Sequence, residues 1–159
     1  MIMFRTYAAA ALAAIALMSS AHVVADDRVP PVTNDLVRKE CGKCHMAFQP
    51  AFLPARSWNR MMSELADHFG ENASLSANKV AAIRAYLTAN AADAAPGKLA
   101  RKYLRRIGPG ETPQRITDNP EFAREHRFPE RVWKDPKVVT KSNCPACHPR
   151  AERGDYDDD

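Results

Sequence analysis

Two copies of one short motif constrain this chain more than any other feature of its sequence. Residues 41–45 are CGKCH and residues 144–148 are CPACH, and these two segments contain all four cysteines of the 159-residue chain. Each motif places two thiols three positions apart on one turn of chain, with an imidazole beside them. Two such thiols can add to the two vinyl groups of one haem, and the histidine then faces the iron from the proximal side. The pattern therefore predicts two covalently bound haems c.

The motifs assign both the thioether bonds and the proximal iron ligands. A zinc site with four cysteine ligands would separate its two pairs by about 15–20 residues and would leave both histidines unexplained. A thioredoxin-like site needs a βαβ context, and no alternating strand pattern lies near either motif. Two disulfides would not require a histidine at both fifth positions. The haem-binding cysteines are Cys41, Cys44, Cys144 and Cys147, and the proximal ligands are His45 and His148.

The first 25 residues are predicted to be a secretory signal peptide. Arg5 gives a positive start, residues 8–18 form an unbroken apolar run, and residues 23–25 offer small side chains before a cleavage site. Retention as a membrane anchor is the alternative, but the run is shorter than the roughly 18 residues that a membrane helix needs. Cleavage after residue 25 removes Arg5 and His22 and lowers the formal net charge of +4 by one. We expect a soluble protein exported to the periplasm.

Two further histidines are candidates for the sixth coordination position of each iron. Once His22 is removed, only His68 and His126 remain beside the two proximal histidines. Each lies at a similar separation from one motif, on its inner side. The simplest pairing joins His45 to His68 on the first iron and His126 to His148 on the second. The sequence also permits the crossed pairing.

Methionine is the alternative sixth ligand, because Met/His ligation is common in small cytochromes c. Met46 adjoins a proximal ligand and cannot turn to the opposite face. Met61 and Met62 could reach an iron, but with neighbouring apolar residues they follow a helical spacing that predicts a packed face. His68 could instead end a helix at the surface, where a cation interacts favourably with the helix dipole. No methionine follows Met62, so His126 has no such competitor.

The sequence predicts a mainly α-helical fold. Either of residues 33–34 can cap a short helix that leads into the first motif. A second helix is expected over residues 57–69, and a third from Ser76 with an apolar and aromatic face. Asn119 followed by Pro120 starts another short helix before the second motif. No strand-like alternation persists anywhere in the sequence.

The chain is expected to divide into two haem domains after the signal peptide. Residues 26–97 form the first domain and residues 98–159 the second, with the Ala-, Pro- and Gly-rich residues 91–97 at the boundary. Residues 98–115 are basic and form either a solvated, partly helical linker or a surface for haem propionates or an acidic partner. Residues 155–159 form an acidic tail that we expect to be mobile.

Several short segments outside the haem motifs also share a pattern with one known family. Taken with both motifs, they resemble the exported dihaem cytochromes c known as DHC. This resemblance implies two bis-histidine haems and electron transfer, with an N-terminal half like a class I monohaem cytochrome c and a C-terminal half of short helices and loops around the second haem. It also implies redox partner proteins, such as a membrane b-type cytochrome or a small oxygen-binding cytochrome. The segments are Leu53-Pro54, Ser57-Trp58, Asp67-His68-Phe69-Gly70, Arg115-Ile116-Thr117, Phe122, Glu125-His126, Val132-Trp133, Pro136, Asn143 and Ala151-Glu152-Arg153-Gly154.

We therefore predict a periplasmic electron carrier with two low-potential haems, no catalytic residues and no nucleic-acid partner. Two imidazoles stabilise ferric iron more than an imidazole and a thioether do, which lowers the reduction potential. The alternative is a dihaem peroxidase or a gas-binding cytochrome, either of which needs one iron with an open or displaceable position. Because two large apolar haems would fill much of the interior of such a small chain, their removal is expected to abolish folding.

Overall fold

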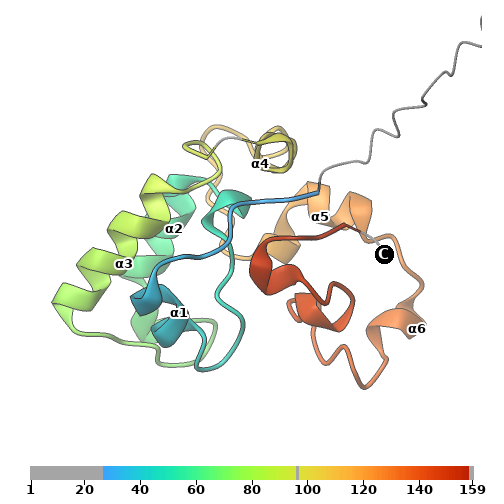
Figure 1. Cartoon of the computed structure of the whole chain (residues 1–159), viewed down its shortest axis with the longest axis horizontal. Coiled ribbons are helices and arrows are strands. Elements are labelled where there is room, and N and C mark those ends of the chain that lie inside the picture. The colour runs from blue at the N-terminus through green and yellow to red at the C-terminus, as the bar shows by residue number, and fades with distance from the viewer. Residues whose placement is uncertain (1–26, 96, 158–159) are drawn as a thin grey trace, which may run out of the picture.

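The computed structural model describes residues 27–95 and 97–157, so the predicted signal peptide lies outside the described residues. In this part of the chain, six α-helices and several short 3-10 turns surround two buried clusters (Figure 1). Apart from two isolated bridges, the described residues form no β structure, and the prediction of a mainly α-helical fold is confirmed. None of these helices has the length and apolar character needed to cross a membrane.

Three helices form the first part of the molecule: α1 (Asp35–Cys41), α2 (Ala55–Ser63) and α3 (Ala77–Ala89). The predicted cap of α1 is confirmed, because the Asn34 side chain accepts a hydrogen bond from the Val37 amide at 3.0 Å. Helices α2 and α3 pack side by side, with α1 below them in Figure 1. Their buried side chains form the helical cluster, which consists of Val32, Val37, Leu53, Trp58, Met62, Ile83, Leu87 and Ala91.

The start of α2 differs from the prediction by two residues. The helix begins at Ala55 and not at Ser57, whose side chain does not act as its cap. Pro54 occupies the N-cap position with extended backbone, and its carbonyl accepts the Ser57 amide at 2.9 Å. Asp93, far along the chain, supplies the missing capping group by accepting the Ala55 amide at 2.9 Å. A cap provided by a distant residue leaves no local signal in the sequence.

The end of α2 also differs, because the helix stops at Ser63 and does not continue to the predicted end. Arg84 of α3 donates a hydrogen bond to the Met62 carbonyl at 3.1 Å, which satisfies a carbonyl at the end of α2. A separate 3-10 turn, Leu65–Asp67, follows. His68 therefore lies after that turn and outside any α-helix, which removes the interpretation of His68 as a helix-terminal residue.

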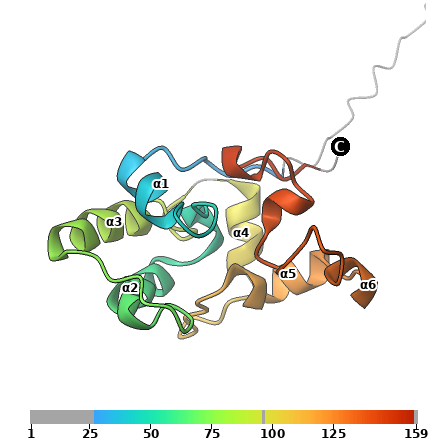
Figure 2. The ribbon, with the colours of Figure 1, turned by 90° about the horizontal axis from the view of Figure 1, so that it is seen from below.

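The basic stretch begins with a core helix and not with a solvated linker. Helix α4 (Lys98–Leu104) buries Leu99, Ala100 and Tyr103, and it lies between the α1–α3 group and the second half in Figure 2. Its buried face belongs to the junction cluster, where Phe52 meets the Tyr103 ring edge-on with centroids 5.0 Å apart. The junction cluster draws on both expected domains and consists of Val29, Ala51, Phe52, Ala92, Leu99, Ala100, Tyr103 and Phe122.

The second half contains two short helices, α5 (Pro120–Glu125) and α6 (Glu130–Trp133). The predicted start of α5 is confirmed, because Asn119 is its N-cap and accepts the Glu121 amide at 2.8 Å. Asn119 is itself fully buried and donates to the Tyr103 carbonyl at 3.2 Å. Helix α5 is therefore tied directly to α4.

The two ends of the described chain lie side by side, and the prediction of a mobile tail is wrong for residues 155–157. The Val29 amide donates to the Gly154 carbonyl at 2.9 Å, and the Tyr156 amide donates to the Asp27 carbonyl at 3.1 Å. The Tyr156 hydroxyl also donates to the Gln49 side chain at 2.6 Å. Gly154 has φ +75°, and a Cβ there would meet the Val29 carbonyl oxygen at 2.1 Å, so the approach requires glycine. Residues 158–159 lie outside the described part of the chain.

Candidate haem-binding sites

The four histidines of the described chain lie in two facing pairs. The ring centroids of His45 and His68 are 6.1 Å apart, and those of His126 and His148 are also 6.1 Å apart. These are the partners that the simplest pairing from the sequence joins. Each pair contains one histidine from a C-x-x-C-H motif and one from outside it.

The separation within each pair fits a single metal ion between the rings. A metal–imidazole bond of about 2 Å on each side, with about 1.1 Å from the ring nitrogen to the ring centre, predicts centroids about 6 Å apart. Phe128 and Trp133 lie 6.0 and 6.2 Å from His126 without such a role, so it is the pairing of two imidazoles at this distance that fits a metal ion. The residues present therefore fit an iron held by two imidazoles in each half.

The two pairs differ in the angle between their ring planes. The His45 and His68 planes are 24° apart and nearly parallel, whereas the His126 and His148 planes are 74° apart and nearly perpendicular. Both arrangements allow two nitrogen donors on opposite faces of one macrocycle. An iron bound by each pair would therefore have a different orientation of its two imidazole planes.

The rival uses of the cysteines find no support in the described residues. No disulfide joins any of the four cysteines. Between residues 27 and 157, position 96 apart, no group of three or more His, Cys, Asp or Glu side chains is arranged to hold a metal ion, as a zinc site would require. Burial raises the pKa of Cys41 and that of Cys144, the latter to about 11, whereas redox-active dithiols have a lowered thiol pKa. Met62, one alternative ligand, is buried in the helical cluster, and Met61 packs against that cluster.

The first proximal histidine is held by its immediate neighbours. The Nδ1–H of His45 donates to the Met46 carbonyl 2.7 Å away, which leaves Nε2 with the lone pair that a metal needs. The His45 ring also stacks on Phe48, with centroids 4.9 Å apart. These contacts fix both the tautomer and the direction of the ring.

A buried carboxylate ties the first motif to α3. The Glu40 side chain is 2% exposed and accepts hydrogen bonds from Lys43, inside the motif, at 2.6 Å and from Lys79 of α3 at 2.8 Å. These two hydrogen bonds lower the pKa of Glu40 to about 2. Glu40 directly precedes Cys41, so this ion-pair group fixes the cysteine end of the motif against the helical core.

His68 lies in a tight turn that brings it back toward His45. Its amide donates to the Glu71 carbonyl at 2.7 Å, and the Glu71 amide donates to the His68 carbonyl at 3.2 Å. Burial lowers the pKa of the His68 imidazole, and the neighbouring His45 and Arg115 lower it further. The imidazole is thereby favoured in its neutral form, which is the form that binds a metal.

His126 follows directly after α5, and that helix sets its position. The Nδ1–H of His126 donates to the Phe122 carbonyl at 3.0 Å, and the imidazole stacks on the Phe122 ring with planes 13° apart. A hollow of about 350 Å³ lies beside it, lined in part by Phe128 and Trp133. Lys141 lies over the Trp133 ring at 5.3 Å. Aromatic walls fit the edge of a flat, apolar macrocycle, and Lys141 and Glu130 add one charge of each sign to the lining.

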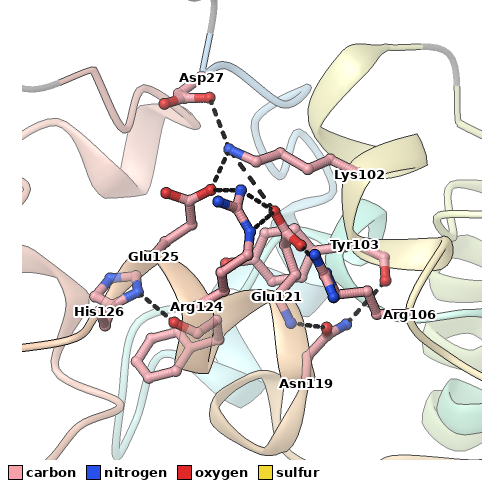
Figure 3. A network of polar contacts seen from close by, with 10 residues as sticks. Asp27, Lys102, Tyr103, Arg106, Asn119, Glu121, Arg124, Glu125 and His126 are labelled. Atoms are coloured by element: carbon pink, nitrogen blue, oxygen red, sulfur yellow. Dashed lines mark hydrogen bonds and ion pairs between the residues drawn. The ribbon is translucent and has the colours of Figure 1, made fainter.

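A second buried carboxylate anchors α5, as Figure 3 shows. Glu121 is 1% exposed and accepts from Arg106 at 2.5 Å and from Arg124 at 2.6 Å. Hydrogen bonds from Arg124 and Arg106 outweigh burial and lower the pKa of Glu121 to about 2. Lys102 of α4 adds a contact to Glu125 at 2.8 Å, and Arg124 pairs with Glu125 as well. The network joins α4 to the helix that carries His126.

The second motif forms a 3-10 turn, Cys144–Ala146, followed by His148. The His148 amide donates to the Cys144 carbonyl at 2.8 Å, so the histidine stays close to the first cysteine of its own motif. Its ring meets Tyr156 edge-on with centroids 5.4 Å apart. The docked C-terminal segment therefore contacts the histidine of the second motif.

Three charged residues near these sites were not identified from the sequence. Glu40 and Glu121 each precede a basic residue by three positions, and this helical spacing predicts one ion pair for each. It does not predict the second cation of each carboxylate, Lys79 or Arg106, which is farther along the chain. The sequence places Arg115 in the basic stretch and in one of the family-like segments without a contact of its own, yet its guanidinium carbon lies 3.9 Å above the Phe69 ring, next to His68. Each of these contacts depends on the tertiary fold.

Comparison with known proteins supports the same chemistry. The model of the dihaem cytochrome c family, DHC, matches residues 37–156. A solved dihaem cytochrome c from Rhodobacter sphaeroides is 44% identical, with a TM-score of 0.73, and the match covers 80% of this chain and 100% of that one. A dihaem c-type cytochrome from Shewanella baltica is 36% identical, with a TM-score of 0.64, and the match covers 78% and 87% of the two chains. No curated protein matches the chain.

Proposed function

Because this chain belongs to the dihaem cytochrome c family and so carries two covalently attached c-type haems, we propose that it transfers electrons with both irons held between two histidines. His45 and His68 hold the first iron, and His126 and His148 hold the second. Cys41 and Cys44 bind the first haem, and the second motif's cysteines bind the other. The observation that carries this proposal is the 6.1 Å separation of both histidine pairs.

The chain's own residues prepare these ligands for a metal. The carbonyls of Met46 and Phe122 accept the Nδ1–H groups of His45 and His126, so the lone pair of each ring lies on Nε2, the atom that would bind a metal. Such hydrogen bonds also make an imidazole a stronger donor, which stabilises the ferric state. Bound haem supplies one-electron chemistry between ferric and ferrous iron. Two histidines on each iron give both haems low potentials, because a thioether would favour the ferrous state.

The location and partners follow from the sequence. We infer export to the periplasm from residues 1–25, and two haem units over residues 26–97 and 98–159. A cytochrome c exchanges electrons with redox partner proteins. The family resemblance favours a membrane b-type cytochrome or a small oxygen-binding cytochrome as those partners.

We infer a carrier and not an enzyme, because four histidines for two irons leave neither iron with an open position. The dihaem peroxidase or gas-binding alternative requires one iron that a small ligand can reach. Carbon monoxide binds ferrous haem where a ligand is absent or leaves readily, so it separates the two functions.

The test uses the reduced, unmutated holoprotein at neutral pH. We expect a low-spin spectrum that carbon monoxide hardly changes, whereas His68→Ala and His126→Ala should each create a response in about half of the haem. Lys141→Ala, which changes the rim of the second site without removing a ligand, is the control and should behave as the parent. A rapid, stoichiometric response of one haem in the parent would overturn the carrier function and favour the peroxidase or gas-binding alternative.

A further inference from the structure

The turn that carries His68 has an unusual backbone. Phe69 has φ +58°, a left-handed conformation that aromatic residues rarely adopt, and Gly70 follows with φ +96°. The Asp67 side chain accepts the Gly70 amide at 3.1 Å and closes the turn. Phe69 is also 46% exposed. A large apolar ring in this conformation depends on contacts from outside the turn to hold its place.

The outside contact comes from the second half of the chain. The guanidinium carbon of Arg115 lies 3.9 Å above the Phe69 ring centroid, and the other neighbour of that ring is the His68 imidazole, with centroids 4.8 Å apart. A guanidinium over an aromatic face is held by both electrostatics and stacking. The three groups thus form one stack of cation, ring and imidazole.

The backbone of Arg115 is firmly anchored. The next residue, Ile116, packs against both the helical cluster and the junction cluster and begins the 3-10 turn Ile116–Asp118. Among the side chains of residues 27–95 and 97–157, no carboxylate forms an ion pair with Arg115. Arg115 is exposed to solvent, and the contact with the Phe69 ring places its unpaired positive charge.

We propose that Arg115 is a positioning residue of the second half that holds a fixed positive charge beside His68 and thereby raises the reduction potential of the first haem. This rests on the proposed role of His68 as a ligand. Ferric haem carries one more positive charge than ferrous haem, so a nearby cation favours the ferrous form. The second histidine pair, His126 and His148, has other ring neighbours, among them Phe122 and Tyr156.

The test is a spectroelectrochemical titration of the full holoprotein. Arg115→Gln removes the charge and keeps most of the side-chain length, and we expect it to change the ferric-to-ferrous ratio of the first haem about tenfold at fixed applied potential. That change corresponds to a decrease of about 59 mV for a one-electron couple. Arg115→Lys keeps the charge and should restore most of the potential. The second haem should not move in either variant.

Arg56→Gln is the matched control. Arg56 also links α2 to the second half, by hydrogen bonds to the Gly108 and Glu111 carbonyls at 2.9 and 2.7 Å, but it contacts neither histidine of the first pair. An unchanged first-haem potential in Arg115→Gln, or an equal shift in Arg56→Gln, would overturn the proposal. His68→Met in the same titration identifies the first haem. If His68→Met changes the reduction potential of neither haem, His68 is not a ligand and the proposed function fails. If His68→Met changes one potential but Arg115→Gln does not, only the proposal for Arg115 fails.

Discussion

The two halves of this molecule each hold a pair of histidines, but in different ways. In the first half, three helices build a buried cluster of their own, and His45 and His68 lie at its edge with nearly parallel rings. In the second half, helices α5 and α6 contribute one buried side chain, Phe122, to a cluster that they share with α4, and the histidine rings are nearly perpendicular. The second site therefore depends on the rest of the chain far more than the first.

Electrostatics compensates for the smaller core of the second half. In the described part of each half, one buried carboxylate is held by cations: Glu40 by two lysines, and Glu121 by two arginines with Lys102 farther off at 4.0 Å. Arginine forms several directed hydrogen bonds where lysine offers a point charge. Arg106, which follows α4, and Arg124 pair with Glu121 and so connect α4 to α5, the helix that precedes His126. The comparison teaches that ligand geometry can rest either on apolar packing or on a network of charges.

The largest expected effect is the loss of one haem. Cys144→Ser with Cys147→Ser prevents attachment of the second haem, and the second half should then unfold because little apolar surface remains buried there. The helical cluster should persist and keep the first haem low-spin. Limited proteolysis read by mass spectrometry should show new cleavage sites confined to residues 105–153.

The reciprocal variant is the control for that comparison. Cys41→Ser with Cys44→Ser removes the first haem, and both halves should become sensitive to protease, because the junction cluster needs Phe52 and Ala92 from the first half. Equal cleavage patterns in the two double variants would contradict the asymmetry between the halves.

The next effect concerns the two buried carboxylates. Glu121→Gln keeps the size but removes the only carboxylate paired with Arg106 and one of the two paired with Arg124 among the described residues, and we expect it to lower the free energy of unfolding by about 2 kcal/mol. Glu40→Gln should cost less, because its lysine partners can turn to water. Chemical denaturation followed by circular dichroism measures both, with Glu125→Gln at the rim of the network as the matched control. A larger loss for Glu40→Gln would reverse the ranking of the two networks.

The same carboxylates predict a pH dependence. The pKa of Glu121 is lowered from 4.5 to about 2 in the folded protein, so the unfolded chain binds more protons between these values and stability falls as pH falls through that window. The stability difference between the parent and Glu121→Gln should be full above about pH 5 and should shrink toward pH 2. Thermal unfolding of both proteins across this range measures it. If the stability difference between the parent and Glu121→Gln does not vary with pH, the arginines do not lower the pKa of Glu121.

Local signals in the sequence predicted some elements well. Asn34 and Asn119 both cap the helices expected of them, because capping depends on the next three residues. Local signals do not give either end of α2, because Asp93 supplies its cap and Arg84 donates to a carbonyl at its last turn. The charge of the tail predicts mobility, yet Tyr156 is held there by Gln49. Contacts between residues far apart in the chain leave no periodic pattern to detect.

For the candidate sites, too, the sequence predicts which residues take part but not how they are oriented. Counting histidines was enough to name all four candidates and the simplest pairing, because few other donors exist. The ring angles could not be predicted, since they depend on contacts such as that between His126 and the Phe122 carbonyl. The basic stretch showed its charges but not their separate roles: Lys102 joins the α5 network, whereas Arg115 reaches the His68 turn.

A smaller and spectroscopic effect sharpens the comparison of the two irons. Two nearly parallel imidazole planes interact with the same one of the two iron orbitals d(xz) and d(yz), so the energies of these two orbitals differ. Two nearly perpendicular planes interact with one orbital each, so the two energies stay close. Electron paramagnetic resonance of the frozen, oxidised protein should therefore show one rhombic low-spin signal and one broad signal at a larger g value. The rhombic signal should change in His68→Met and the broad one in His126→Met. Two superimposed rhombic signals would contradict the 24° and 74° angles.

The ligand assignment is tested most directly by the reduction potentials of two single variants. A thioether donates less to ferric iron than an imidazole does, so replacing a histidine ligand by methionine raises the potential of its own haem. We expect His68→Met to raise the potential of one haem and His126→Met to raise that of the other, with both raised in the double variant. If both single variants shift the same haem, the pairing within each half is wrong. If His68→Met shifts neither, His68 is not a ligand and the first iron is held differently.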